Sequence, residues 1–600
     1  WAGVREEETL GKVLQAVAAE AQSFEPRGLS SMAWAFASLA VEELGILHVI
    51  AREATARLAR FSPQELASLA YALARRTVRS DELLRAITEK LHAKLPEFNP
   101  QDLCNIAWSF AKYGESIDQI PHVIANESRA QLTAFEPAQL CALVQSFAMF
   151  GVADARLFHA VADQVMTKLR SLGPKEMSTT VWSFAKLGVK ESLLFRSVAE
   201  RAASMVSDFA LPDLSDMSWA YVTMNLQEPA LFRAIALHLV SKLDALDVEG
   251  LSHEAAASFA ADTRKQVWAL CFAGCLEDKL LTLARARLLQ MGRLLDSPNR
   301  RMHMPTGSPS GRGSPSEPYI VLDLADRFVI EKPPGWRVDS EFLPGLPASQ
   351  DWGRKQLSEY IRTLLASRLG PILDDQSHQR GFLHRLDVPS SGLVIVARTY
   401  EAFLDLQLQL VTDSLVRDYA VLCHGWVPPE RRGVTASLRW DQRAGSPCVV
   451  RPRGKPSHTQ TAVLAHACLR AGVAVALLAM RIATGRRHQI RVHSAHIGHP
   501  VACDTTYAGL RALRSDRKWC PRNFLHRHRL AFADVHGARR EAVAPLPDDL
   551  VAALRLLAPR DQSSTEALGA WEGSEGPQAW EACTVLRSKP RRVASSGGLP

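Results

Sequence analysis

The first half of the chain repeats at a fixed interval of 37 residues. Each unit starts with an aromatic or leucine residue, and five of the six units carry a tryptophan or tyrosine ten positions later. The starting residues are Phe24, Phe61, Phe98, Phe135, Leu172 and Phe209. The later residues are Trp34, Tyr71, Trp108, Trp182 and Trp219, with Gln145 in the fourth unit. A period that holds through six registers without slippage predicts a repeat architecture.

Each 37-residue unit has the pattern of two helices. A proline follows the starting residue by two positions in the first five units, after capping candidates such as Ser62 and Asn99, which suits a first helical turn. Apolar residues five, eight, nine and twelve positions after the start lie on one stripe of that helix. Residues 80–95 illustrate the second amphipathic segment. Stacked hairpins of this kind form an α-solenoid, which we assign to residues 1–291, with a degenerate last unit around Trp268.

The aromatic positions of the repeats have two possible roles. Residues that recur at a fixed period normally pack in the core, so we expect these rings to be hairpin core and not platforms for stacked bases. If the repeats read RNA, the reading side chains are then the polar residues beside the rings, such as Gln101, Asp102 and Asn105.

The second half of the chain has a different texture. Residues 292–318 are rich in Pro, Ser, Gly and Arg and are predicted to be a flexible linker. Residues 319–336 read as two short strands around a turn at Ala325 and Asp326. Further strand candidates follow at 392–396, 419–423, 461–467 and 473–480, with helical segments at 355–368 and 402–410 between them. This mixture predicts an α+β domain with a mixed, mostly antiparallel sheet over residues 319–557. The polar, Gly/Ser-rich residues 558–600 are predicted to be a disordered tail.

Charge and composition favour a nucleic-acid partner. The formal net charge is +8, and residues 481–530 hold 11 basic residues against two acids, Asp504 and Asp516. Such a surplus, carried mainly by arginine, suits a phosphate-bearing partner, although a merely soluble basic surface gives the same count. The ten cysteines contain no CxxC pair, which favours free thiols. The longest apolar run, 474–480, is far shorter than the roughly 20 residues of a membrane span.

The repeat cores "WSFAKYG" from Trp108 and "WSFAKLG" from Trp182 resemble the octotricopeptide and heptatricopeptide repeats of organellar RNA-binding proteins, including those with RAP domains. The resemblance covers about residues 20–285. It implies RNA as a partner and a mitochondrial or chloroplast location, while helical solenoids also bind proteins. Because the chain starts at Trp1, we expect the natural amino terminus to lie upstream.

Five ordered blocks in the second half resemble the RluA-type pseudouridine synthases. They are "YIVLDLADRFVIEKPPGW" (319–336), "HRLDVPSSGLVIVAR" (384–398), "LVRDYAVLCHG" (415–425), "ATGRRHQIRVHSAHIGHPVACDTTYAG" (483–509) and "FLHRHRLAF" (524–532). The resemblance implies an enzyme that isomerises uridine to pseudouridine in RNA without a cofactor. The chain departs from the family pattern at Ser390 (usually Thr), Arg398 (Lys), Arg487 (Thr) and Cys503 (Gly).

The same resemblance implies the site residues. The family aspartate maps onto Asp387, as nucleophile or as base, and the arginine of HQIR, Arg491, keeps it charged. Such a pair gains on the order of 4 kcal/mol at about 4 Å before desolvation is counted. Tyr419 matches the tyrosine that packs on the target base and helps move its C5 proton. Further residues are expected to contact the extruded nucleotide: His384, Arg385, Lys332, Arg486, Arg487, Gln489 and Ile490.

Other assignments of these residues compete with this one. His493, His496 and His499 have an HxxHxxH spacing, but no carboxylate or thiolate is placed to complete a zinc site, so no metal is predicted. A hydrolase triad of His384, Asp387 and Ser391 lacks a GxSxG turn. The alternatives for the whole chain are an RNA-binding or ribosome-assembly factor with a degenerate synthase domain, and a scaffold whose solenoid grips protein.

Overall fold

The computed structural model describes residues 7–39, 44–114, 120–296, 316–339, 355–365, 370–440, 446–451, 454–469, 472–573 and 580. The chain divides into two compact units, residues 1–238 and 239–600, called here the N-terminal and C-terminal units. The predicted all-α first part and the α+β second part are confirmed. Most of the predicted linker at 292–318 lies outside the described residues; its first residues end a helix and its last three precede a strand.

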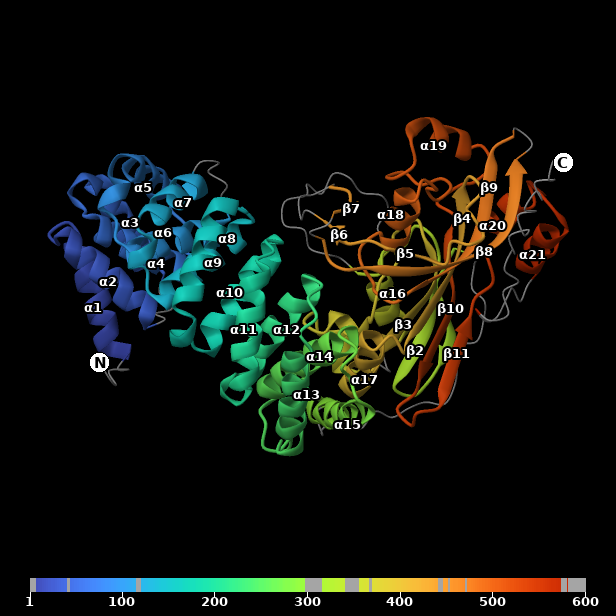
Figure 1. Cartoon of the computed structure of the whole chain (residues 1–600), viewed down its shortest axis with the longest axis horizontal. Coiled ribbons are helices and arrows are strands. Elements are labelled where there is room, and N and C mark those ends of the chain that lie inside the picture. Colours follow the sequence, from blue (N-terminus) through green and yellow to red (C-terminus); the bar gives the residue numbers. More distant parts are fainter. Residues whose placement is uncertain are drawn as a thin grey trace, which may run out of the picture. The chain divides into compact units, whose positions relative to one another are not determined.

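The N-terminal unit is a stack of helical hairpins, and each 37-residue repeat forms one of them (Figure 1). The first helices of the repeats pack on one another in chain order. They are α2 (Pro26–Ser38), α4 (Pro63–Arg75), α6 (Pro100–Tyr113), α8 (Pro137–Phe150), α10 (Pro174–Leu187) and α12 (Leu211–Thr223). The second helices are α3 (Gly45–Ala56), α5 (Asp81–Lys94), α7 (Ile120–Ala130), α9 (Ala155–Thr167) and α11 (Ser192–Ser204). Helix α1 (Glu7–Glu20) precedes them, and α13 (Pro229–Asp244) crosses into the next unit.

The caps of these helices follow the sequence pattern. Ser62 accepts a hydrogen bond from the Glu65 amide while the Glu65 side chain binds the Ser62 amide, and Asn99 forms the same capping box with Asp102. The carbonyls of the starting residues are bound from the end of the second helix of the same repeat: Arg57 donates to Phe24, Gln131 to Phe98 and Lys168 to Phe135. These bonds join the two ends of each hairpin.

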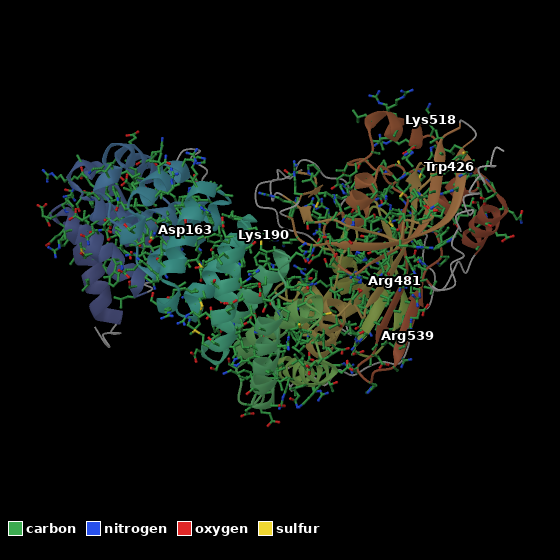
Figure 2. All side chains as sticks on the ribbon, in the orientation of Figure 1. Asp163, Lys190, Trp426, Arg481, Lys518 and Arg539 are labelled. Carbon is green, nitrogen blue, oxygen red and sulfur yellow. The ribbon has the colours of Figure 1, made fainter. Side chains whose placement is uncertain are left out.

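The C-terminal unit is built on a twisted sheet. In the described residues its strands pair in the order β1-β2-β3-β10-β4-β9-β8-β12, with β11 beside β10 and β5 beside β8. All of these pairs are antiparallel except β3 with β10. The strands are β1 (Tyr319–Asp323), β2 (Arg327–Lys332), β3 (Ser391–Ala397), β4 (Val416–His424), β5 (Gly433–Thr435), β8 (His458–Leu469), β9 (Ala474–Ile482), β10 (Leu525–Ala533), β11 (Arg539–Val543) and β12 (Leu557–Pro559). Figure 2 labels Arg481 on β9 and Arg539 at the start of β11.

Helices and one small two-stranded ribbon accompany this sheet. The helices are α16 (Leu357–Leu364), α17 (Tyr400–Val411), α18 (Gln489–His496), α19 (Leu510–Asp516), α20 (Asp548–Leu554) and α21 (Gln562–Glu572). The strands β6 (Leu438–Arg439) and β7 (Val449–Val450) form a separate ribbon beside α18. Short 3-10 turns link several of these elements.

The hairpin of α14 (His253–Phe272) and α15 (Asp278–Leu295) belongs to the C-terminal unit and packs on α17. Gly292 lies so close to α17 that a Cβ atom there would be 2.3 Å from the Glu401 Cα. Asp296 accepts hydrogen bonds from the amides of Tyr400 and Glu401, which start α17. Arg285 donates to Asp405 of α17 at 2.9 Å and to the Asp534 carbonyl at 3.0 Å. The hairpin around Trp268 is thus part of the body that holds the sheet.

The predicted disordered tail is wrong over its first part. Strand β12 begins at Leu557 and helix α21 follows it, and α21 buries Ala567, Leu568 and Trp571 beside β8. The apolar stripe of α21 packs on the sheet. In the sequence this stripe is hidden by the Gly- and Ser-rich residues around the helix. Residues 574–579 and 581–600 lie outside the described part of the chain.

Candidate active site

Asp387 lies in the loop that leads into β3, one of the central strands. Lys332, at the end of β2, supports this loop from the interior. Its Nζ donates to the carbonyls of Pro333, Trp336 and Val388 at 2.9, 3.0 and 3.3 Å. Gly392 follows with φ of 118°, and a Cβ there would meet the Arg527 carbonyl at 2.3 Å. Only glycine suits this close approach of β3 to β10. The local sequence therefore fixes Asp387 just before the start of a central strand of the sheet.

Arg491, on the first turn of α18, joins Asp387 to a second carboxylate. Its Nη1 donates to Asp387 Oδ2 at 2.8 Å, while Nε and Nη2 donate to the two oxygens of Asp504, each at 2.7 Å. The side chain of Asp387 is 17% exposed, that of Arg491 4% and that of Asp504 0%. The predicted Asp387–Arg491 pair is therefore formed in the structure, with only the aspartate open to solvent.

Arg491 and Asp504 stabilise each other in their charged forms. Burial disfavours the Arg491 cation, but the hydrogen bonds and charges of Asp504 and Asp387 outweigh it and raise the pKa of Arg491 above its usual value. Burial opposes the Asp504 anion in the same way, yet the hydrogen bonds and charge of Arg491, with the amides of Thr506 and Tyr507, lower the pKa of Asp504. Asp387 thus faces a permanent cation that Asp504 holds in place.

Tyr419 lies on β4 and is buried. Its hydroxyl accepts two hydrogen bonds from Arg527 of β10, from Nε at 2.9 Å and from Nη2 at 2.6 Å. The other donors of Arg527 bind Nδ1 of His384 at 2.5 Å and the carbonyls of Leu393 and Arg385 at 2.9 and 3.3 Å. Arg527 therefore links the tyrosine to the loop that carries Asp387.

Three of the residues predicted to contact the nucleotide lie in this loop or next to it: His384, Arg385 and Lys332. Arg385 is exposed, and His384 is half-buried beside Arg527. Burial, with the charges of Arg527 and Arg417, lowers the pKa of His384 well below its usual value, so the ring is neutral. Lys332 is fully buried, and its ammonium joins the Val388 carbonyl of this loop to the carbonyls of Pro333 and Trp336 after β2. Burial, the charge of Arg522 and, to a lesser degree, that of Arg527 lower the pKa of Lys332 to about 7. The prediction that Lys332 contacts substrate is wrong, because its ammonium faces the interior.

Of the four residues in the GRRHQIR run that were predicted to contact the nucleotide, two are buried and two are half-buried. Gln489 is buried, where its amide donates to the His458 carbonyl and its oxygen accepts from Thr484. Ile490 is also buried. Both are structural, since they dock α18 on β8, and the predicted substrate contact is wrong for them. Arg486 and Arg487 are half-buried, and Arg487 lies over the Trp440 ring at 4.3 Å.

The competing constellations are not assembled. Ser391 binds Nδ1 of His526 at 2.9 Å, whereas His384 binds Arg527, so the three triad candidates do not form a relay. His493 is held between the Thr459 hydroxyl and the Ala436 carbonyl, and His499 binds the His424 carbonyl. Within the described part of the chain, no group of three or more metal-ligating side chains is present.

Several site residues were missed from the sequence. Asp504 and Arg527 contact the predicted residues directly, and His488 lies with Nε2 3.7 Å from Asp387 Oδ1. Tyr507 accepts from the Cys448 amide and bonds the His488 ring. The scarcity of acids in the Arg491 region, which has only Asp504 and Asp516 among its many basic residues, was the available signal for Asp504. Cys503 has φ of 58°, which explains why glycine suits the position before Asp504.

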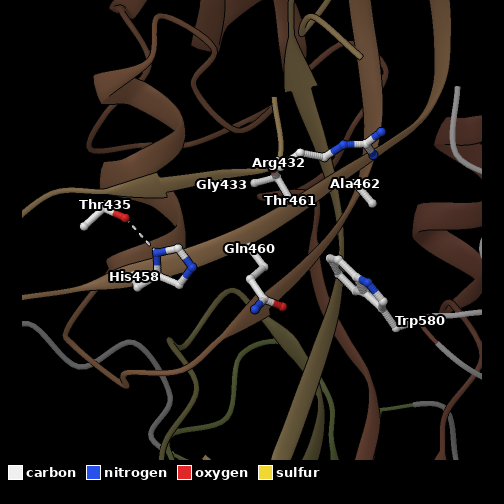
Figure 3. Close-up of a pocket in the computed structure, with 8 residues that line it drawn as sticks. All are labelled: Arg432, Gly433, Thr435, His458, Gln460, Thr461, Ala462 and Trp580. Atoms are coloured by element: carbon white, nitrogen blue, oxygen red, sulfur yellow. Dashed lines mark hydrogen bonds between the residues drawn. The ribbon is translucent and has the colours of Figure 1, made fainter. Parts of the chain in front are cut away.

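A hollow of about 590 Å³ lies away from this cluster (Figure 3). Arg432, Thr435, His458, Gln460 and Trp580 line it along β5 and β8. His458 and Gln460 face the hollow, whereas Thr459 between them binds Gln489 and His493 on the other face of the strand. The hollow is therefore separated from Asp387 by the sheet.

Two family comparisons cover most of the chain. Residues 326–496 match the RNA pseudouridylate synthase family, and residues 6–295 match the RNA-editing substrate-binding complex 6 protein. The resemblance seen in the five blocks is confirmed, and the matched segment contains Asp387, Tyr419 and Arg491.

Curated relatives agree with the match to the RNA pseudouridylate synthase family. Ribosomal large subunit pseudouridine synthase D of Neisseria meningitidis is 33% identical over 257 residues, 41% of this chain and 63% of the relative. The protein of that name from Nitrosomonas europaea is 35% identical over 248 residues, 40% of this chain and 64% of the relative. The solved human RNA pseudouridylate synthase domain containing 1 is 25% identical, with a TM-score of 0.33, and covers 44% of this chain and 99% of its own. The chain thus spans just under two thirds of these two curated relatives.

The described residues contain no helix that is both long and apolar enough to cross a membrane.

Proposed function

We propose that this protein is an RNA pseudouridine synthase that isomerises a uridine in an RNA chosen partly by its helical repeats. The observation that carries the proposal is the Asp387–Arg491–Asp504 cluster, which sets one partly exposed carboxylate against a cation within a segment that matches the synthase family. The relatives are named for RNA and for the large ribosomal subunit, and either kind of transcript suits the basic region around Arg491.

The reaction needs a carboxylate that is ionised yet reachable. Asp387 suits both needs, because it accepts a hydrogen bond from the Arg491 cation at 2.8 Å and its side chain is 17% exposed. This carboxylate attacks the substrate or abstracts the proton that starts glycosidic cleavage. The base is then rotated and C5 joins C1′, a rearrangement without net redox change. In this proposal Tyr419 packs against the base and accepts the C5 proton.

The nucleotide must be extruded from folded RNA before this chemistry. Arg385, which is exposed beside the cluster, is placed to hold the extruded nucleotide or its phosphate. Arg486 and Arg487 are half-buried and offer additional cations for a phosphate oxygen. A mitochondrial or chloroplast location stays a prediction from the repeat class.

The test replaces Asp387 and maps pseudouridine in RNA incubated with the purified full chain. Asp387→Asn keeps the shape but removes the charge, so turnover falls to background while RNA affinity stays within about twofold. Asp374→Asn, on an exposed surface pair with Arg362, is the matched control and keeps full activity. Turnover by Asp387→Asn refutes the proposal. Absence of pseudouridine with the wild-type chain supports the alternative of an RNA-binding factor with a degenerate domain.

A further inference from the structure

The first helices of the repeats leave one stripe of side chains at the surface of their stack. Counted from each starting residue, its positions are three, seven, ten and fourteen, which lie on one face of a helix. The tenth positions are the repeated aromatic residues. Trp34 is 53% exposed, and Tyr71, Trp108, Trp182 and Trp219 are half-buried, whereas the rings at the twelfth positions, such as Phe110, are buried. The prediction that the periodic rings form hairpin core therefore holds for the twelfth positions, holds only in part for the half-buried rings at the tenth positions, and is wrong for Trp34.

Four of these rings form two pairs across neighbouring helices. Tyr71 and Trp108 have centroids 4.9 Å apart, and Trp182 and Trp219 have centroids 6.3 Å apart. Ring–ring contact holds these four side chains in place while one part of each stays open to solvent. The fourth repeat interrupts the row, because its stripe consists of Ala138, Ala142, Gln145 and Met149.

The same stripe carries positive charge. Five exposed cations occupy its third and fourteenth positions: Arg27, Arg75, Lys112, Lys175 and Lys186. Lys186 lies over the Trp182 ring at 4.6 Å. The stripe has one acid, Asp216. The nearby acids at position four are Glu65, Asp102, Glu176 and Asp213. Glu65 and Asp102 are engaged in capping boxes, and Asp213 feels the charge of Lys175. Asp102 is buried, so the prediction that it reads RNA is wrong.

We propose that this aromatic–basic stripe binds single-stranded RNA, which deepens the proposed function and rests on it. Unpaired bases stack on the open faces of the rings, and the flanking cations neutralise phosphates. Alternation of rings and cations along a row suits a flexible polyanion with aromatic bases. A duplex hides those base faces and cannot use the rings. The uncharged fourth repeat divides the contact into two segments, repeats one to three and repeats five to six.

The experiment measures affinity of the full chain for a fluorescent, unstructured 20-nucleotide RNA and for the same sequence as a duplex, over a range of salt. Removing two stripe cations with Lys112→Gln and Lys175→Gln should reduce the slope of log affinity against log salt by about 1.4, since each single-strand phosphate contact contributes about 0.7. The matched control removes two exposed cations from the second helices, Arg156→Gln on α9 and Arg196→Gln on α11, and leaves the slope unchanged.

The aromatic part is tested with Trp34→Ala, at the most exposed ring of the row. Loss of one stacked base lowers the affinity about 5-fold or more. An unchanged melting temperature shows that the fold is kept, and ultraviolet crosslinks should map to the rings in repeats one to three and five to six.

The proposal is overturned if the lysine and tryptophan variants bind like the wild type, as expected for a surface that serves a protein partner. It is equally overturned if the duplex binds as tightly as the single strand. Pseudouridine formation at saturating RNA separates this result from the proposed function. The stripe variants should raise KM and keep kcat, whereas a wild-type chain that binds through the stripe and makes no pseudouridine refutes the proposed function alone.

Discussion

Replacing Asp504 with Asn tests whether the site depends on the buried acid that holds Arg491. The carboxylate is fully buried and takes two of the guanidinium hydrogen bonds at 2.7 Å. The Asn oxygen can still accept from the amides of Thr506 and Tyr507, but its NH₂ group faces the Nε–H of Arg491. Breaking a buried pair costs about 3–5 kcal/mol, and the retained oxygen places this change near the lower limit, about 3 kcal/mol.

The expected loss of stability is measurable by thermal and urea unfolding. For a unit of this size, about 3 kcal/mol corresponds to a fall in Tm of roughly 6–12 °C. The matched control is Asp549→Asn, because Asp549 binds Arg522 through the same two-bond geometry but is 33% exposed. That change should cost less than about 1 kcal/mol.

The pH dependence of this difference has a defined sign. The pKa of Asp504 in the folded chain lies below its ordinary value, so the pair stabilises the fold above about pH 3.9, and the stabilisation is lost as pH falls through the folded-state pKa. The Tm difference between wild type and Asp504→Asn should therefore be constant near neutral pH and narrow in acid. Freed from Asp504, Arg491 also orients Asp387 poorly, and kcat should fall about 100-fold. A variant with the wild-type Tm and turnover refutes this account of the cluster.

Three further predictions address the surroundings of the site. Arg527→Lys cannot reach both Tyr419 and His384 with one ammonium, so kcat in a pseudouridine assay should fall about 10-fold or more with little change in circular dichroism. Burial opposes the charged form of Asp375, but hydrogen bonds from Ser377, Tyr400 and His378 lower its pKa to about 2. The wild type should therefore be more stable than Asp375→Asn above about pH 4, and this difference should vanish as pH falls through about 2. Urea unfolding over this pH range measures the difference. A chain of residues 239–600 should unfold cooperatively, whereas residues 319–600 should melt at lower temperature, because removing α15 uncovers α17 and takes Arg285 from Asp405.

The helical part of the fold could be predicted because its signal is local and repeated. Proline after a capping residue and an apolar stripe determine each first helix, and the period fixes how the hairpins stack. Which face of the stack stays open could not be predicted, since periodicity marks the positions of Trp108 and Phe110 equally. Only the packing of neighbouring helices shows that the second is buried and the first is not.

The site was predictable only in part, because its members come from distant segments. Asp387 and Arg491 are 104 residues apart, and the family blocks, not any spacing rule, brought them together. Lys332 and Gln489 stand inside those blocks, and a motif does not distinguish a side chain that contacts substrate from one that supports the loop. Burial makes that distinction, since each has its polar atoms satisfied by protein groups.

Strand β10 shows why charge in a sequence is a poor guide to exposure. Its run His526, Arg527, His528 and Arg529 is wholly buried, because the strand lies between β3 and β4. Arg529 is compensated by Asp418 and Glu541, as a structural arginine must be. Arg527, 1% exposed, has only neutral oxygen and nitrogen atoms as its hydrogen-bond partners among the described residues. A buried cation without a carboxylate raises the free energy of the fold, and two of its donors are used to fix the Tyr419 hydroxyl, so we expect Arg527 to be retained for positioning that side chain and not for stability.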